Sequence, residues 1–261
     1  MVGVAAGSGV YVKLLGRPYL ITCEHVITCT TSSGYTLAHL PKVENYYHGL
    51  PHPWFMEEFP VDLAVTYIDP ASWDTGDRSG VPIELVAEQF APVEHELLFI
   101  AGHPGELSKF QNIPGDVKLK SNRALYLARE SPLPTGFDPA IHFAMQYEMK
   151  KAKATDGSSH RLPNPTGLSG SAIWDTGFTA SGYSEKWNSG SARMVGIAQR
   201  WLEDESCIIG TKAEAVRRFL LEQVKGDLAY HHWITRGRPD GCVAEIDVQY
   251  AHSIATTLKS E

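Results

Sequence analysis

The sequence predicts an all-β fold with one helix near its C-terminal end. Two observations support this fold class. The apolar segments are short and rich in β-branched and aromatic residues, as half-buried strands are. Gly, Pro, Asp and Asn bound most of them, which is typical of antiparallel sheets rather than of strands alternating with helices. We therefore expect a barrel or a sandwich of antiparallel strands.

Eight segments fit this description in chain order. The first two are separated by a glycine-bearing turn, and the last two flank a stretch, 175–192, that is rich in Gly, Ser and Thr. A further strand is expected at 241–248, with no assignable partner. The eight expected strands are 9–15, 19–22, 63–68, 96–100, 118–120, 140–145, 171–174 and 194–198.

One segment, 211–224, has helical periodicity instead. Its apolar residues recur at intervals of three and four: Ala213, Val216, Leu220 and Val224. Thr211 can cap the helix, Glu214 completes a capping box, and Gly226 can end it. The sequence therefore predicts a helix that packs on the sheets.

Composition bounds the class of protein. The 261 residues, 43% of them hydrophobic, suffice for a substantial core, and the net charge of −7 without a basic cluster argues against nucleic-acid binding. No apolar run reaches membrane-spanning length and no secretory signal begins the chain, so we expect a cytoplasmic protein with no membrane partner. The four cysteines are too irregularly spaced for a disulfide scaffold or a zinc site, and free thiols are expected, although Cys23 and Cys29 could meet across a turn.

Three short motifs carry the chemistry. They are Thr22-Cys23-Glu24-His25-Val26, then Asp62-Leu63-Ala64-Val65, then Gly167-Leu168-Ser169-Gly170-Ser171. A serine hydroxyl is hardly ionised at neutral pH, so it becomes a nucleophile when a histidine accepts its proton and a carboxylate orients that histidine. Each motif alone is weak evidence, but the order His, Asp, Ser and the separations of 37 and 107 residues together indicate nucleophilic catalysis.

These motifs resemble those of trypsin-like serine peptidases of the bacterial type. Gly7-Ser8-Gly9-Val10 is similar to the strand that precedes the catalytic histidine in that family, and Gly102-His103-Pro104-Gly105 to a turn of its bacterial members. The resemblance runs from about residue 7 to 224. It implies two antiparallel six-stranded β-barrels in a chymotrypsin-like arrangement, with a C-terminal helix. The implied divisions are 1–85 for the first barrel, 86–210 for the second, 211–226 for the helix and 227–261 for a tail of unknown role.

The resemblance also assigns roles. Ser169 becomes the nucleophile, His25 the general base and Asp62 its orienting carboxylate, while the backbone N–H groups of Gly167 and Ser169 form the oxyanion hole. No metal or organic cofactor is implied. Leu168 stands where the family has an aspartate, so maturation through a newly cut amino terminus is not expected.

Substrate preference is less well specified. The resemblance places the specificity pocket at residues before the nucleophile and along a late strand: Pro163, Ala198, Gln199, Arg200 and His142. Pro163 occupies the position of a trypsin-type aspartate, so cleavage after Lys or Arg is not expected. Arg200 or His142 could instead favour an acidic or polar residue.

The leading interpretation is thus a serine endopeptidase that acts on a protein or peptide substrate. A latent or inactive protease-like binding module, controlled by a regulatory partner or a fused sensor domain, stays open as an alternative. An α/β-hydrolase is disfavoured, because its acid and base follow the nucleophile and its nucleophile motif ends in Gly where this chain has Ser171.

Overall fold

The computed structural model describes most of the chain up to Arg236. The described residues are 7–14, 16–33, 38–39, 48–50, 54–68, 80–113, 116–121, 124–154, 157–183 and 187–236, with only the backbone at 38–39, 48–49, 109–113, 116–121, 224 and 226–236. The chain divides into two compact units, Met1–Leu221 and Glu222–Glu261. All the elements that build the site belong to the first unit.

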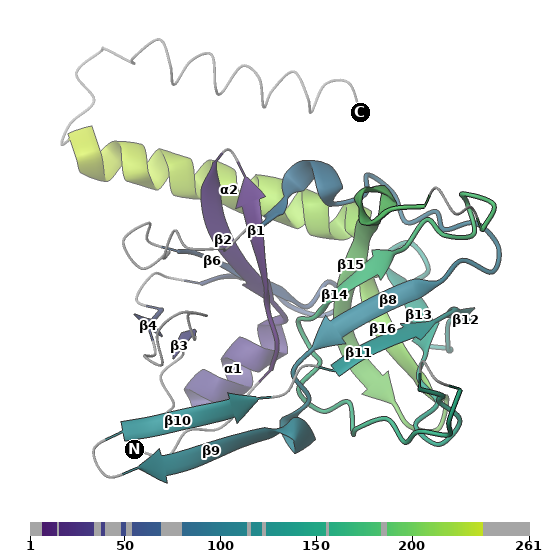
Figure 1. Cartoon of the computed structure of the whole chain (residues 1–261). Coiled ribbons are helices and arrows are strands. Elements are labelled where there is room, and N and C mark those ends of the chain that lie inside the picture. The colour runs from purple at the N-terminus through teal and green to yellow at the C-terminus, as the bar shows by residue number, and fades with distance from the viewer. Residues whose placement is uncertain are drawn as a thin grey trace. The chain divides into compact units, whose positions relative to one another are not determined.

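The first unit is mostly β, as the sequence predicts, and its strands form two main sheets (Figure 1). The smaller sheet has the order β5-β6-β2-β1-β7. Its strands are β1 (Val10–Leu14), β2 (Arg17–Thr22), β5 (Phe55–Glu57), β6 (Leu63–Tyr67) and β7 (Val81–Pro82). Only β1 and β7 pair in parallel; the other pairs are antiparallel.

The larger sheet has the order β11-β8-β14-β15-β16-β13-β12 and is antiparallel throughout. Its strands are β8 (Leu98–Gly102), β11 (Ala124–Ala128), β12 (Glu130–Ser131), β13 (His142–Gln146), β14 (Ala172–Asp175), β15 (Arg193–Leu202) and β16 (Cys207–Lys212). Two small hairpins complete the strands, β3 (Ala38–His39) with β4 (His48–Gly49) and β9 (Ser108–Ile113) with β10 (Asp116–Ser121). The described strands thus lie in open orders of five and seven, and closure into two six-stranded barrels stays a prediction.

Helix α2 (Ala213–Arg236) differs from the expected helix at both ends. Thr211 belongs to strand β16 and its hydroxyl donates to the Val61 carbonyl at 2.9 Å, so it does not cap the helix. Gly226 does not end the helix either, because a single glycine costs only about 1 kcal/mol in a helix interior. Within the first unit, Glu214 accepts the Phe90 N–H at 2.8 Å and so ties α2 to the chain before β8.

Helix α1 (Glu24–Ser32) was not expected. Its second half is made of Thr, Cys and Ser, which have low helix propensity and hide the periodicity. The hydroxyls of Thr30 and Thr31 return to the carbonyls of Val26 and Ile27 four residues earlier, so their polar groups are satisfied inside the helix. The buried Val26 and Ile27 anchor its first turn.

The core of the larger sheet is apolar and continuous. Phe90 stacks on Phe143 with ring centroids 4.2 Å apart, and each such aromatic ring contributes roughly 2–3 kcal/mol through its burial. This core supports two neighbouring strands of the candidate site: β14, which begins three residues after Ser169, and β15, which carries Gln199. Its fully buried members include Leu98, Ile100, Phe143, Met145, Tyr147, Ile173, Val195, Ala198 and Ile208.

A buried carboxylate, Glu96, organises the loop after β14. Its side chain accepts N–H groups of Leu97, Thr179 and Ala180 at 2.9–3.0 Å. Burial alone would raise the pKa of Glu96, but these donors and the Thr176 hydroxyl lower it overall. Because the folded pKa is depressed, this contribution to stability is present above the unfolded pKa and is lost as the pH falls through the folded pKa.

The Glu96→Gln variant should therefore have a free energy of unfolding about 2 kcal/mol lower than the parent at pH 7. The difference should shrink as the pH falls below about 4.3, where the unfolded carboxylate protonates. Urea denaturation at pH 7 and pH 3 measures both values. The neighbouring Glu94→Gln, whose side chain is exposed, serves as the control and should change little. A deficit of equal size at both pH values would contradict this role for the charge.

Cys23, Cys29 and Cys207 are free thiols. Cys242 and the strand expected at 241–248 lie outside the described residues. No helix within the described part of the chain is long and apolar enough to cross a membrane.

Candidate active site

His25 and Asp62 form a close pair. His25 lies in the first turn of α1, and its Nδ1 is 2.7 Å from Oδ2 of Asp62, while its backbone N–H donates to Oδ1 of the same carboxylate at 3.0 Å. The first N–H groups of a helix have no partner within the helix. Asp62 therefore both caps α1 and orients the imidazole of His25. An ionised carboxylate only accepts, so Nδ1 carries the proton and Nε2 is left as the acceptor.

Asp62 occupies a restricted position. Its φ is +51°, a conformation that few residues other than Gly, Asn and Asp adopt without cost. Its N–H donates to the Glu58 carbonyl at 3.1 Å, and β6 begins at the next residue. The Asp62 side chain is 2% exposed and that of His25 is 38% exposed, so a partly exposed imidazole is bonded through one ring nitrogen to a buried carboxylate.

Ser169 lies on the loop that precedes β14. Its hydroxyl donates to the Gln199 carbonyl of β15 at 2.9 Å, and a bond from this hydroxyl to His25 is not among those of the described residues. Gly170 follows with φ +89°, and a Cβ there would overlap the Ser8 carbonyl oxygen and the Thr22 hydroxyl. The glycine lets this loop pack directly on the segment that precedes β1 and on the end of β2.

The backbone on the N-terminal side of the serine has a defined orientation. Gly167 has φ +96°, and the carbonyl of Thr166 before it accepts the Gly105 N–H at 2.8 Å. In a trans peptide the C=O and N–H point in opposite directions. The bond to Gly105 therefore turns the Gly167 N–H away from residues 104–105.

The same argument applies to the amide of Ser169. The Leu168 carbonyl accepts the Ser171 N–H at 2.9 Å, which directs the Ser169 N–H to the opposite side. Among the hydrogen bonds of the described residues, none uses the N–H of Gly167 or of Ser169 as donor. Two peptide donors beside the serine hydroxyl thus have no acceptor within the described part of the chain, and an oxyanion hole is built from donors of this kind.

Cys23 is buried beside the His25–Asp62 pair, and its thiol is not suited to act as a nucleophile. Its Sγ donates to the Ala198 carbonyl at 3.2 Å, and it is within 4.8 Å of ligand-type atoms of His25 and Asp62. Burial, and then the Asp62 carboxylate, raise the pKa of the Cys23 thiol well above its usual range. A thiol that stays protonated is a poor nucleophile and a poor metal ligand, so the chemistry points to Ser169.

The residues expected to bind substrate are in two different environments. Ala198, Gln199 and His142 are buried. Both ring nitrogens of His142 contact backbone, Nε2 the Pro60 carbonyl at 2.8 Å and Nδ1 the N and O of Asp138 at 3.2 and 3.1 Å. The Gln199 amide nitrogen also donates to the Pro60 carbonyl, at 3.0 Å. These side chains hold the chain before Asp62 in place.

Pro163 and Arg200 are more accessible. Pro163 is half-buried, and its carbonyl accepts the Tyr147 hydroxyl at 2.9 Å. Arg200 is exposed on β15, and its guanidinium lies 5.1 Å above the ring of Phe59, which is itself 51% exposed. Of the five expected substrate-binding residues, Arg200 is the one that offers a charge to solvent. The sequence analysis did not identify Phe59 as a residue near the site. Its position three residues before Asp62 was the one sequence feature that could have indicated this.

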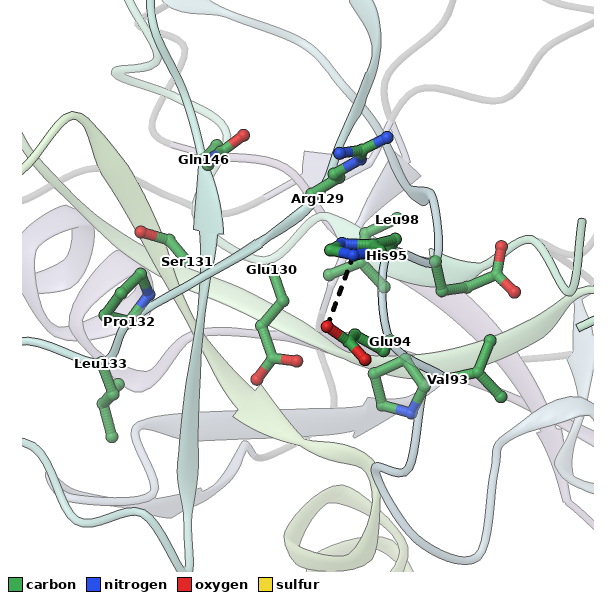
Figure 2. A pocket seen from close by; sticks show the side chains of 12 residues that line it. Val93, Glu94, His95, Leu98, Arg129, Glu130, Ser131, Pro132, Leu133 and Gln146 are labelled. Carbon is green, nitrogen blue, oxygen red and sulfur yellow. Dashed lines mark ion pairs between the residues drawn. The ribbon is translucent and has the colours of Figure 1, made fainter. Parts of the chain in front are cut away.

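A separate surface hollow of about 520 Å³ lies beside strand β12 (Figure 2). Glu94, His95, Arg129 and Glu130 are among its lining residues, and His95 pairs with Glu94 at 3.4 Å. His25, Asp62 and Ser169 do not line it. Its lining is polar and mostly exposed, whereas Asp62 is buried and Ser169 half-buried.

Comparisons with known proteins add little to this geometry. Neither a protein-family model nor a curated protein matches the sequence. One similar solved structure comes from a study of aromatic interactions in the coupled folding and binding of the disordered Sesbania mosaic virus VPg protein, with TM-score 0.42, 14% identity and 78% coverage of each chain. Another is a Glu endopeptidase in complex with MPD, with TM-score 0.40, 15% identity and coverage of 84% of this chain and 90% of that one. Likenesses this weak leave the arrangement of the site as the basis for a function.

Proposed function

We propose that this chain is a trypsin-like serine endopeptidase, a hydrolase that cleaves peptide bonds through an acyl-enzyme intermediate. The observation that carries the proposal is the His25–Asp62 pair at 2.7 Å, together with a serine whose neighbouring amides have no acceptor among the described residues. No other titratable group is needed for the reaction. Gly167 and Ser169 supply the oxyanion donors.

The reaction follows from these atoms. Ser169 Oγ forms a bond to the substrate carbonyl carbon while its proton passes to Nε2 of His25, and the resulting imidazolium is stabilised by Asp62. The carbonyl oxygen becomes an oxyanion, which accepts hydrogen bonds from the N–H groups of Gly167 and Ser169. The C–N bond then breaks, and the leaving amine takes the proton from His25. Water repeats the sequence on the acyl-enzyme and releases the second product.

A latent protease-like module is the second candidate, and one specific contact favours it. The Ser169 hydroxyl donates to the Gln199 carbonyl at 2.9 Å, so in this conformation it is not bonded to His25. For catalysis the hydroxyl must leave this carbonyl for Nε2. Catalytic hydrogen bonds are often made only when substrate is bound, so the contact is compatible with an active enzyme as well.

Labelling with a fluorophosphonate probe separates these candidates. An active peptidase should form a covalent adduct, and mass spectrometry should locate it on Ser169. A folded protein that neither labels nor cleaves a proteome-derived peptide library would support the latent module. The same library, read by mass spectrometry, gives the residue preference.

Arg200 is the basis for a substrate preference. Its exposed guanidinium over Phe59 favours substrates with an acidic side chain near the scissile bond. The Arg200→Ala variant should lower kcat/KM for acidic peptides about five-fold relative to neutral ones, as expected from the loss of about 1 kcal/mol in an exposed ion pair. Arg193→Ala, at the other end of the same strand, is the matched control and should keep the preference. An unchanged ratio in Arg200→Ala would remove Arg200 from recognition.

A further inference from the structure

Ser8 makes an unusual number of hydrogen bonds for a residue just ahead of a strand. It is 8% exposed and precedes β1 by two residues. Its N–H donates to the Ser169 carbonyl at 2.8 Å, and its hydroxyl donates to the Gly167 carbonyl at 2.7 Å. The same hydroxyl accepts the His103 N–H at 3.0 Å, and its carbonyl accepts the Thr22 hydroxyl at 2.7 Å.

These bonds complete a pattern along the nucleophile loop. Four consecutive carbonyls, those of residues 166–169, each accept one hydrogen bond. The donors to residues 166 and 168 are the backbone amides of Gly105 and Ser171. Ser8 supplies the other two, and its hydroxyl is the one side-chain donor in this set. The loop conformation therefore depends on the Ser8 hydroxyl in a way that a substitution can test.

The hydroxyl acts at a sensitive point. It donates to the carbonyl of the peptide between Gly167 and Leu168, whose N–H donates to the Pro165 carbonyl at 2.8 Å. This peptide lies between the two peptides whose N–H groups have no acceptor among the described residues. Gly167, at φ +96°, has no Cβ to restrict rotation of that peptide. Leu168 is 3% exposed and uncharged, so its side chain can make no ion pair that would hold the loop.

We propose that Ser8 is a positioning residue that keeps the amides of Gly167 and Ser169 aimed at one point. The inference rests on the proposed peptidase activity. It adds that the Ser8 hydrogen bonds keep the oxyanion hole formed, so that no new amino terminus has to be cut to order it. Segments that adjoin the strands of the smaller sheet thereby contribute to the site through Ser8 as well as through His25 and Asp62.

The test compares Ser8→Ala with the parent. Because misaimed amides weaken binding of the transition state more than of the substrate, kcat should fall about ten- to a hundred-fold with KM nearly unchanged. Affinity for a peptide aldehyde, whose adduct places an oxygen on these amides, should fall by the same factor. A purely structural loss would not separate kcat from KM in this way.

Thr176→Ala is the matched control. The Thr176 hydroxyl also donates to one group, Glu96, and accepts one backbone amide, that of Phe178, but it lies beyond the opposite end of β14 from Ser169. This variant should lose thermal stability and keep the parent's kcat. Equal kcat losses in both variants, or a kcat and an aldehyde affinity within two-fold of the parent in Ser8→Ala, would overturn the proposal.

Amide hydrogen exchange provides a readout that needs no activity. In Ser8→Ala the hydrogen-bonded amides of this loop, those of Leu168, Gly170 and Ser171, should exchange at least ten-fold faster than in the parent, with little change across β15. If the parent neither labels nor cleaves, the proposed function fails, and this exchange still decides the role of Ser8. Equal exchange in the loop of both proteins overturns it.

Discussion

Replacing Ser169 with alanine should lower peptidase activity about a million-fold, because a triad acts as a unit and the remaining rate comes from binding and the oxyanion donors alone. The fold should survive the change. The Ser169 side chain is half-buried and its hydroxyl makes a single bond, to the Gln199 carbonyl. Steady-state hydrolysis of a peptide identified from the library measures the rate, and thermal unfolding confirms that the variant is folded.

Ser131→Ala is a suitable control for this experiment. Ser131 is also half-buried, and it lines the hollow beside β12 rather than the site around His25. It should keep the parent's rate and fluorophosphonate labelling. Peptidase activity that persists in Ser169→Ala would remove this serine from its role, and a parent without activity would leave the latent module as the better description.

The site could be anticipated from the sequence to the extent that its chemistry resides in side chains. His, Asp and Ser each stand in a short motif, and the structure places two of them, 37 residues apart in the chain, within 2.7 Å. The specificity residues were less accessible to this reasoning. Position along a strand did not reveal that His142 and Gln199 turn inward to the Pro60 carbonyl, whereas Arg200 faces solvent.

The backbone of the nucleophile loop could not be anticipated in the same way. Its conformation depends on which amide meets which carbonyl, and backbone groups are the same at every residue. Gly7-Ser8-Gly9 and Gly167-Leu168-Ser169 are far apart in the chain, and no residue type in either predicts that Ser8 donates to both Gly167 and Ser169. The glycines were a partial signal, because a close approach such as that at Gly170 excludes a Cβ.

The local sequence pattern missed helix α1 and gave the wrong ends for helix α2, for different reasons. α1 has weak helix formers, and it is stabilised instead by Asp62, which accepts the N–H of His25 from outside the helix. That contact joins residues 37 positions apart, so the sequence around α1 does not indicate it. α2 runs past Gly226 because stopping signals are weak preferences that the surrounding residues can outweigh.

The Asp62→Asn variant should lower kcat about ten-thousand-fold at neutral pH. Asn fits the backbone, because it tolerates the φ of +51° that Asp62 adopts. It has only one acceptor atom where the carboxylate uses two, one for the His25 N–H and one for Nδ1. If the Asn oxygen caps the helix, its NH₂ faces Nδ1, which must then accept. The proton moves to Nε2, and the imidazole can no longer take a proton from Ser169.

Asp175→Asn tests whether the effect belongs to this carboxylate or to any partly buried one. Asp175 also accepts a backbone N–H, from Gly177 at 2.7 Å, and burial raises the pKa of its carboxyl. Its substitution should leave kcat unchanged, since no imidazole depends on it. Asp62→Asn should also label with fluorophosphonate far more slowly than the parent while binding peptide with a similar KM, because the change affects proton transfer rather than recognition. A kcat within ten-fold of the parent would show that His25 keeps its productive tautomer without Asp62, and the catalytic role of the pair would have to be abandoned.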